Sequence, residues 1–129
     1  DGDLSFFSQR HQRVIAAPGR AIISTVPDYA GDGDGLADDF ASYSGTSMAT
    51  PYVTGASVLI REAFDFAGQP DVSQQQIYQL MRDTGDQVWD DDTGAFYTRL
   101  NLAAALNAIM PIDEYGSTAA AAYDLGVLG

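Results

Sequence analysis

The chain has 129 residues, 46% of them hydrophobic, and it contains no cysteine. This is enough apolar material for one small packed core, and the absence of cysteine excludes a disulfide framework and a cysteine-based metal site. Eighteen acidic residues against six basic ones, all arginine, give a formal net charge of −12. Such a charge predicts an acidic, soluble surface and disfavours nucleic acid and anionic membranes as partners.

We expect three sections along the chain and no targeting segment. No run reaches the roughly 18 consecutive apolar residues of a membrane span, and no signal peptide is visible at the start. The sequence opens on Asp1-Gly2-Asp3 without a Met, which we interpret as an interior piece of a longer precursor. Residues 1–111 are expected to form one folded section, residues 112–122 a small polar linker with an alanine run, and residues 123–129 the start of a further, truncated domain.

The first third of the chain predicts strands. Three apolar runs, too short for helices and punctuated by Pro18-Gly19 and Pro27, lie at residues 4–7, 14–17 and 22–26. A loop rich in Gly and Asp follows at residues 28–39. Residues 40–44 then predict a strand that pairs back on residues 22–26.

Three helices are predicted in the rest of residues 1–111. Residues 46–66 carry apolar and small side chains around most of the helical circumference, which is typical of a helix within a core. Pro51 is tolerated there because it lies in the first turn. Ser73 and Gln76 fit a capping box for a second helix that ends near Gly85 and has an apolar stripe of Ile77, Leu80 and Met81. Asn101 predicts the cap of a third helix, stopped by Pro111, with Leu102, Leu106 and Ile109 inward.

The residues best suited to chemistry form the run Gly45-Thr46-Ser47-Met48-Ala49-Thr50-Pro51. Here small residues deliver Ser47 to the first turn of a helix, where free backbone N–H groups and the helix dipole favour negative charge and suit an oxyanion. Gly45 lets the backbone approach a substrate closely. A lone Ser before a helix is, by itself, more often a simple N-cap.

This run resembles the nucleophile motif of the subtilisin-like serine peptidases. Residues 14–19, which end in Ala-Pro-Gly, resemble a strand of that family, and residues 22–27 with 40–44 resemble its hairpin. Residues 53–56 resemble the continuation of the nucleophile helix, and residues 99–106 the closing helix. The resemblance implies an α/β fold, namely the C-terminal part of a subtilisin-like domain with a parallel sheet flanked by helices and a hairpin before the buried nucleophile helix.

The resemblance implies a serine endopeptidase that cleaves protein or peptide substrates through an acyl-enzyme on Ser47. It also implies that Tyr43, Gly45 and Met48 bind the substrate. In the family the catalytic Asp and His precede the Ser along the chain, and neither they nor the oxyanion-hole Asn has a matching position here. We therefore expect the isolated chain to be inactive, and its partner to be the missing N-terminal part of the catalytic domain. By resemblance alone, the expected location is secreted or extracytoplasmic.

Two departures from the family pattern concern histidine. The single histidine, His11, lies between two predicted strands and lacks the His-Gly-Thr setting of the family's base. We interpret it as a solvated loop residue. Tyr52 stands where the family usually has His; that His is not a member of the triad, so the change is expected to alter packing rather than chemistry.

Two alternatives to a peptidase stay open. The first is a non-catalytic, calcium-binding structural piece in which Ser47 is a helix cap. The second is an esterase or lipase, which is disfavoured because no Gly-x-Ser-x-Gly elbow surrounds Ser47. Whatever the activity, we expect the strand at residues 14–17 to have a bare edge. We also expect part of the apolar surface of the long helix, around Ala49, Val53, Ala56 and Leu59, to be uncovered. Such features favour self-association, for example by exchange of the hairpin at residues 22–44.

The loop before the nucleophile helix has a composition suited to a metal. Residues 31–39 read Gly-Asp-Gly-Asp-Gly-Leu-Ala-Asp-Asp. Asp32, Asp34 and Asp38, with the carbonyl of Leu36, have the spacing of the middle of an EF-hand-like loop, which predicts Ca²⁺ as the cofactor. Ala30 occupies the first acidic position and the closing Glu is absent, so a plain solvated turn explains the composition equally well.

Overall fold

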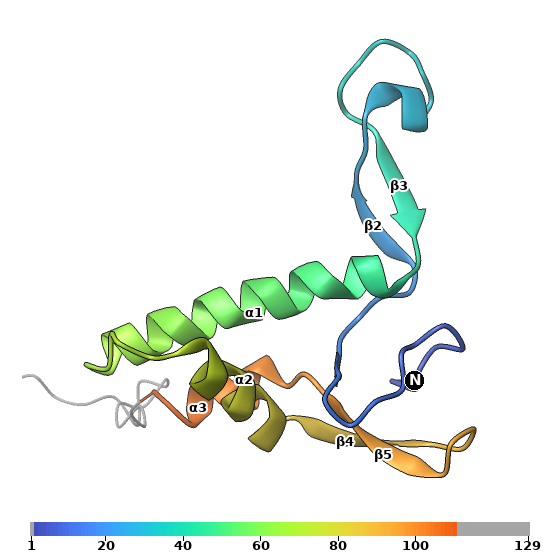
Figure 1. Cartoon of the computed structure of the whole chain (residues 1–129). Helices are drawn as coiled ribbons and strands as arrows, with labels where there is room; N and C mark the ends of the chain where they lie inside the picture. Colours follow the sequence, from blue (N-terminus) through green and yellow to red (C-terminus); the bar gives the residue numbers. More distant parts are fainter. Residues whose placement is uncertain (1, 111–129) are drawn as a thin grey trace, which may run out of the picture.

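The structure is a computed structural model that describes residues 2–110 of the chain. The expected linker and further domain lie outside these residues. The fold is mixed α/β, as predicted (Figure 1). Its elements, in chain order, are β1 (Ile15–Ala16), β2 (Ile22–Thr25), the 3-10 helix η1 (Asp28–Ala30), β3 (Phe40–Tyr43), α1 (Thr46–Phe66), α2 (Gln74–Asp83), β4 (Asp86–Asp90), β5 (Ala95–Arg99) and α3 (Leu102–Asn107).

A three-stranded sheet runs in the order β1-β5-β4. β1 pairs parallel to β5, with Ile15 opposite Thr98, whereas β4 and β5 form an antiparallel hairpin. β1 therefore lies at an edge of this sheet. The predicted strand at residues 14–17 is confirmed in shortened form, and the hairpin β4–β5 was not predicted.

The strand expected at residues 4–7 is wrong. The chain makes a turn there, with the Ser8 amide donating to the Ser5 carbonyl (2.9 Å). Phe6 is 88% exposed and its ring contacts that of Phe7 edge-on. An apolar run becomes a strand only where another strand pairs with it, and none of the described strands lies beside this run.

The second sheet is the hairpin β2–β3, whose predicted pairing is confirmed. Ile22 lies opposite Tyr43 and Thr25 opposite Phe40, and the ladder continues through a bond from the Val26 amide to the Asp39 carbonyl (3.1 Å). The hairpin projects away from the helices, beyond the N-terminal end of α1 (Figure 1). Its base therefore lies next to Ser47, while its loop lies at the far tip.

The core lies between α1, α2 and α3. Ile60 of α1 and Ile77 of α2 are fully buried, and Ala105 of α3 closes the cluster. Truncating either isoleucine to Ala would cost about 2–5 kcal/mol. The expectation that α1 lies within a core holds for one face only, because its other face exposes Tyr52, Val58, Leu59 and Phe66. Of the positions expected to be uncovered, Leu59 is exposed but Ala56 is buried, because it packs in the core cluster.

Both predicted helix caps are confirmed. Ser73 and Gln76 form a reciprocal capping box at the start of α2, in which the Gln76 amide donates to Ser73 Oγ (3.3 Å). The Ala104 amide donates to Asn101 Oδ1 (3.0 Å) at the start of α3. Among the described residues, no helix is long and apolar enough to cross a membrane.

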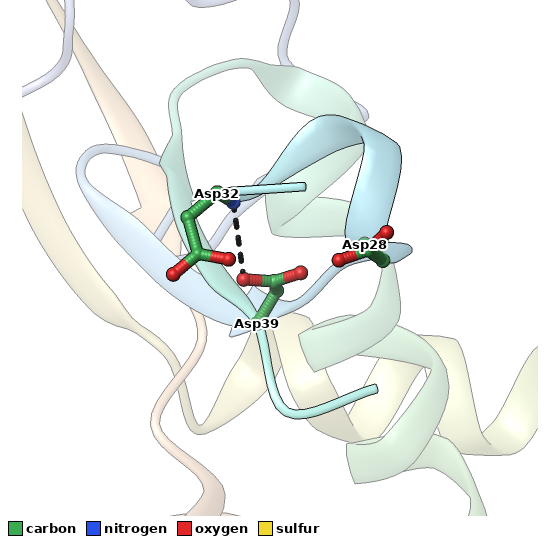
Figure 2. A group of neighbouring side chains, drawn as sticks. All are labelled: Asp28, Asp32 and Asp39. Carbon is green, nitrogen blue, oxygen red and sulfur yellow. Dashed lines mark hydrogen bonds between the residues drawn. The ribbon is translucent and has the colours of Figure 1, made fainter. Parts of the chain in front are cut away.

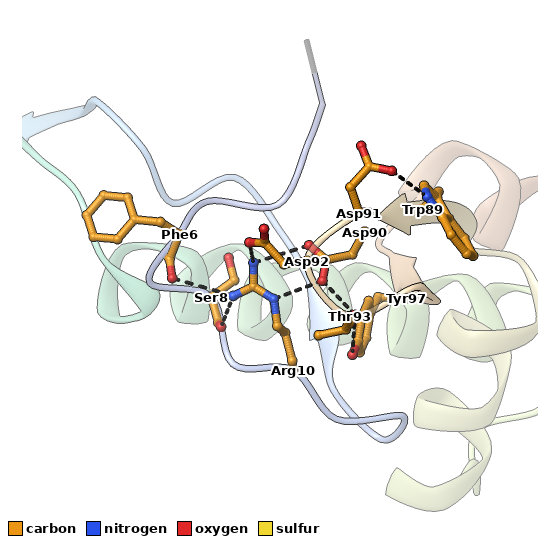
Figure 3. A network of polar contacts seen from close by, with 9 residues as sticks. All are labelled: Phe6, Ser8, Arg10, Trp89, Asp90, Asp91, Asp92, Thr93 and Tyr97. Carbon is orange, nitrogen blue, oxygen red and sulfur yellow. Dashed lines mark hydrogen bonds and ion pairs between the residues drawn. The ribbon is translucent and has the colours of Figure 1, made fainter.

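An ion-pair network ties the N-terminal segment to the hairpin β4–β5 (Figure 3). Arg10 Nε donates to Asp90 Oδ2 at 2.9 Å, and Arg10 Nη2 donates to Asp92 at 3.1 Å. Thr93 Oγ1 also donates to Asp90 (2.6 Å). The bonds from Arg10 and then from Thr93 hold the pKa of Asp90 below its ordinary value. At the other end of the hairpin, Arg99 lowers the pKa of Asp86 in the same way.

Candidate active site

Ser47 is the second residue of α1, and its side chain is exposed. The N-cap position belongs to Gly45, which makes no side-chain cap. Within residues 2–110, Ser47 Oγ has no hydrogen-bond partner. Ser47 is therefore not the cap of this helix, and its hydroxyl is free to take part in chemistry.

The start of α1 presents an electropositive environment beside Ser47. In the described part of the chain, the amides of Thr46 and Ser47 donate to no other group, while the Met48 amide bonds back to the Gly45 carbonyl (3.1 Å). The helix has 21 residues and no acidic residue in its first turn. Free N–H groups at the positive end of a helix dipole can stabilise an oxyanion.

Gly19 allows the segment after β1 to pack closely against the start of α1. The Gly45 amide donates to the Gly19 carbonyl at 2.7 Å. A Cβ atom on Gly19 would lie 2.8 Å from the Gly45 carbonyl oxygen and 3.1 Å from Ala49 Cβ. The Ala-Pro-Gly segment thus contacts the loop that leads into α1, a contact that the sequence did not predict.

A second contact that was not predicted fixes the base of the hairpin. The Ala21 amide donates to Ser44 Oγ at 2.9 Å. Ala21 has a φ of 53°, in the left-handed region that most residues with a side chain avoid. The bond to Ser44 holds the chain in this conformation just before β2, so both sides of the hairpin enter the site at fixed positions.

The three predicted substrate-binding residues lie around Ser47. Tyr43 ends β3 and is 48% exposed. The space around Gly45 is open, because a Cβ atom there would meet only Met48 Sδ and the Ser47 amide, at 3.7 and 3.9 Å. Met48 is half-buried. These positions permit the substrate contacts implied by the resemblance.

A hollow of about 880 Å³ lies beside the start of α1. It is bordered by Gly19, Thr46, Ala49 and Val53, and by Leu4 and Phe7 of the N-terminal segment. Ser47 is not part of its lining. The hollow therefore adjoins the start of α1 but does not include Ser47.

Two other positions singled out in the sequence are on the surface. His11 is exposed, and its Nδ1 accepts a bond from the Arg13 amide at 3.1 Å. It makes no bond to Ser47 in the described residues, in line with a solvated loop residue. Tyr52 of α1 is 46% exposed.

The predicted metal residues are not brought together as a set. Asp32 lies with Asp28 and Asp39, and one carboxylate oxygen from each of these three lies within 4.8 Å of the other two (Figure 2). Asp34 instead accepts a bond from the Leu36 amide (2.8 Å), and Asp38 is exposed. Spacing along the sequence did not reveal Asp28 or Asp39, because the loop folds back on itself.

Comparison with known proteins identifies the family. The chain is 37% identical to an intracellular serine protease of Paenibacillus polymyxa over 86 residues, which are 65% of this chain and 24% of that protein. It is 34% identical to fervidolysin of Fervidobacterium pennivorans over 119 residues, 81% of this chain and 16% of that protein. It is 33% identical to the major intracellular serine protease of Bacillus subtilis over 84 residues, 64% of this chain and 24% of that protein. The chain thus spans a quarter or less of each of these relatives. The model of the subtilase family of serine peptidases matches residues 1–104, and the chain belongs to the subtilase family.

Proposed function

We propose that this chain supplies the nucleophile section of a serine endopeptidase, with Ser47 as the attacking residue. The observation that carries the proposal is the state of Ser47: exposed, without a hydrogen-bond partner among residues 2–110, and placed next to free amides at the start of a 21-residue helix. A structural N-cap would be bonded to the helix, and here Gly45 holds that position.

In the proposed reaction, Ser47 Oγ attacks the carbonyl carbon of a peptide bond and gives its proton to a general base. The carbonyl oxygen becomes an oxyanion, which the Ser47 amide and the positive end of α1 stabilise. The carbon–nitrogen bond breaks as the amine takes up the proton, leaving an acyl-enzyme on Ser47. Water then hydrolyses the ester and regenerates the hydroxyl.

The base and the carboxylate that orients it are proposed to come from outside residues 1–129. His11 is the only histidine, and its Nδ1 is already bonded to the Arg13 amide. The edge of β1 and the hollow beside α1 offer surfaces on which the rest of a catalytic domain could pack. By itself, the 129-residue chain is then inactive, since loss of triad members lowers turnover by about 10⁴–10⁶-fold.

Substitution of Ser47 tests the proposal in the polypeptide that also contains the base. Ser47→Ala should abolish cleavage of a peptide substrate and labelling by a fluorophosphonate, in which Oγ attacks phosphorus and fluoride leaves. Ser57→Ala is the matched control, because Ser57 lies on the same helix with its hydroxyl bonded to the Thr54 carbonyl (2.7 Å). A folded Ser47→Ala protein with full activity would disprove the assignment.

The two alternatives give different results in the same experiment. A non-catalytic structural piece would take up no label on Ser47 in any context. An esterase would hydrolyse activated esters without cleaving peptide bonds. We do not propose secretion, because two of the three relatives compared are named as intracellular proteases.

A further inference from the structure

Three acidic side chains meet in the loop at the tip of the hairpin β2–β3. Asp28 begins η1, Asp32 follows it, and Asp39 immediately precedes β3. One carboxylate oxygen from each lies within 4.8 Å of the other two (Figure 2). None of the three carboxylates forms an ion pair within residues 2–110, so like charges gather here without a neutralising basic group.

Asp39 distinguishes this group from an ordinary cluster of surface carboxylates. It is only 9% exposed, and its Oδ2 atom is buried without a hydrogen-bond partner. Oδ1 accepts a bond from the Asp32 amide at 3.2 Å. Figure 2 shows the Asp39 carboxylate between Asp32 and Asp28, with the second oxygen on the side of Asp28. A buried carboxylate oxygen without a partner is costly, so its position points to a cation.

The backbone of the loop is built closely around this carboxylate. A Cβ atom on Gly31 would clash with Cβ, Cγ and Oδ1 of Asp39. Asp28 Oδ1 accepts a bond from the Gly35 amide at 2.9 Å, which fixes that side chain from across the loop. The amides of Gly31 and Gly33 bond to the Asp28 carbonyl. The loop therefore holds the buried carboxylate in place rather than leaving it to turn towards water.

We propose that Asp28, Asp32 and Asp39 form a binding site for a Ca²⁺ ion. Ca²⁺ takes only oxygen ligands, at about 2.3–2.6 Å, so oxygens on opposite sides of the ion lie roughly 5 Å apart. The separations in this loop fit that limit. Zn²⁺ prefers nitrogen and sulfur ligands, and Mg²⁺ binds most readily with several waters in a strict octahedron. Ca²⁺ tolerates the irregular set of three carboxylates, with carbonyl oxygens and water as further ligands.

The bound ion would hold both sides of the loop together. Asp28 and Asp32 lie on the side that follows β2, and Asp39 lies at the entry to β3. β3 leads directly into Ser44, Gly45 and the start of α1, so Ca²⁺ would order the hairpin that enters the Ser47 site. The binding itself requires nothing of Ser47, and its test is independent of peptidase activity.

Asp34 and Asp38 provide matched controls in the same loop. Each carries the same charge as the proposed ligands, but neither belongs to the group of three. Asp34→Asn and Asp38→Asn therefore reproduce the loss of one negative charge without removing a ligand. Asp32→Asn and Asp39→Asn remove a ligand.

Calorimetric titration of the 129-residue chain with CaCl₂ tests the site. We expect one Ca²⁺ per chain, with Kd between about 10⁻⁵ and 10⁻³ M. Asp32→Asn and Asp39→Asn should weaken binding roughly tenfold or more, because affinity follows the number of charged ligands. Asp34→Asn and Asp38→Asn should weaken it less than about threefold. Ca²⁺ should also raise the melting temperature and protect residues 31–38 from proteolysis.

Two results would overturn the proposal. Equal weakening by all four substitutions would show that Ca²⁺ is attracted only by the net charge of the chain. No binding up to about 10 mM Ca²⁺, well above the range of known protein sites, would show that the loop is only a turn. If Asp39→Asn fails to fold, Asp32→Asn decides the outcome, because Asp32 is exposed and its loss leaves no buried group unpaired.

Discussion

At the scale of single residues, the loop that leads into α1 depends on two glycines for different reasons. Gly45 has open space around it, which would leave room for a substrate in the proposed reaction. Gly19 has none, because an added Cβ atom would meet the Gly45 carbonyl and Ala49. Glycine thus leaves open space at position 45 and allows two segments to pack closely at position 19.

Gly19→Ala should displace the start of α1. The added Cβ would lie 2.8 Å from the Gly45 carbonyl oxygen, which is closer than real Cβ atoms come to backbone. Overpacking of this kind costs about 1–3 kcal/mol, measured as the change in the free energy of unfolding in urea. Gly55→Ala is the control: Gly55 lies within α1 with nothing within 4 Å of an added Cβ, so it should stabilise the chain by up to about 1 kcal/mol. A neutral Gly19→Ala would show that the two segments separate freely.

At the scale of elements, α2 depends on its capping box. Ser73→Ala should cost about 1 kcal/mol, because the Gln76 amide loses its acceptor and the Gln76 side chain keeps only its bond from the Ser73 amide (2.9 Å). Gln75→Ala, at an exposed position one residue away, should change stability by less than about 0.5 kcal/mol. Equal effects of the two changes on urea unfolding would contradict the role of the cap.

The elements show which features can be predicted from sequence. α1 and the two caps depend on neighbours in the sequence, and the hairpin joins two strands that follow each other along the chain; all were predicted. The strand predicted at residues 4–7 was wrong, because a strand needs a second strand to pair with and the composition of the run does not reveal one. β4 and β5 were missed, although the turn at Thr93-Gly94 between them was a usable signal, with Gly94 at a φ of 62°.

The acidic loop shows the same limit. Asp32 was predicted as a metal ligand, but its neighbours in space are Asp28 and Asp39, four residues before it and seven after it. The EF-hand-like spacing selected Asp34 and Asp38. Asp34 accepts a bond from the Leu36 amide within the turn, and Asp38 is exposed. Only the path of the loop through η1 brings the three carboxylates together.

At the scale of the whole molecule, the Arg10–Asp90 pair makes stability depend on pH. Because Arg10 holds the pKa of Asp90 below its ordinary value, the pair stabilises the fold above the unfolded pKa of about 3.9. That contribution is lost as the pH falls through the lower pKa of the folded state. The melting temperature should therefore fall as the pH is lowered below about 4.

Asp90→Asn should lower the melting temperature at neutral pH and make it less sensitive to acid. Asp65→Asn is the control, because Asp65 is exposed and its carboxylate makes no hydrogen bond or ion pair among residues 2–110. If both variants lose stability in acid as steeply as the unsubstituted chain, the ion pair does not contribute to the pH dependence.

The surface of the molecule predicts self-association. β1 is an edge strand, and α1 exposes Tyr52, Leu59 and Phe66 at seven-residue intervals, so that they share one face. Edges and apolar faces of this kind pair with other chains, and we expect light scattering at micromolar concentration to report a dimer or larger species.

Leu59→Lys places a charge in the middle of this apolar face of α1 and should shift the population towards monomer. Thr54→Lys, at an exposed polar position of the same helix, should leave it unchanged. A uniform mass near 13.7 kDa for the unsubstituted chain, with cooperative unfolding, would contradict this and show that the three helices and the small sheet suffice for a stable monomer.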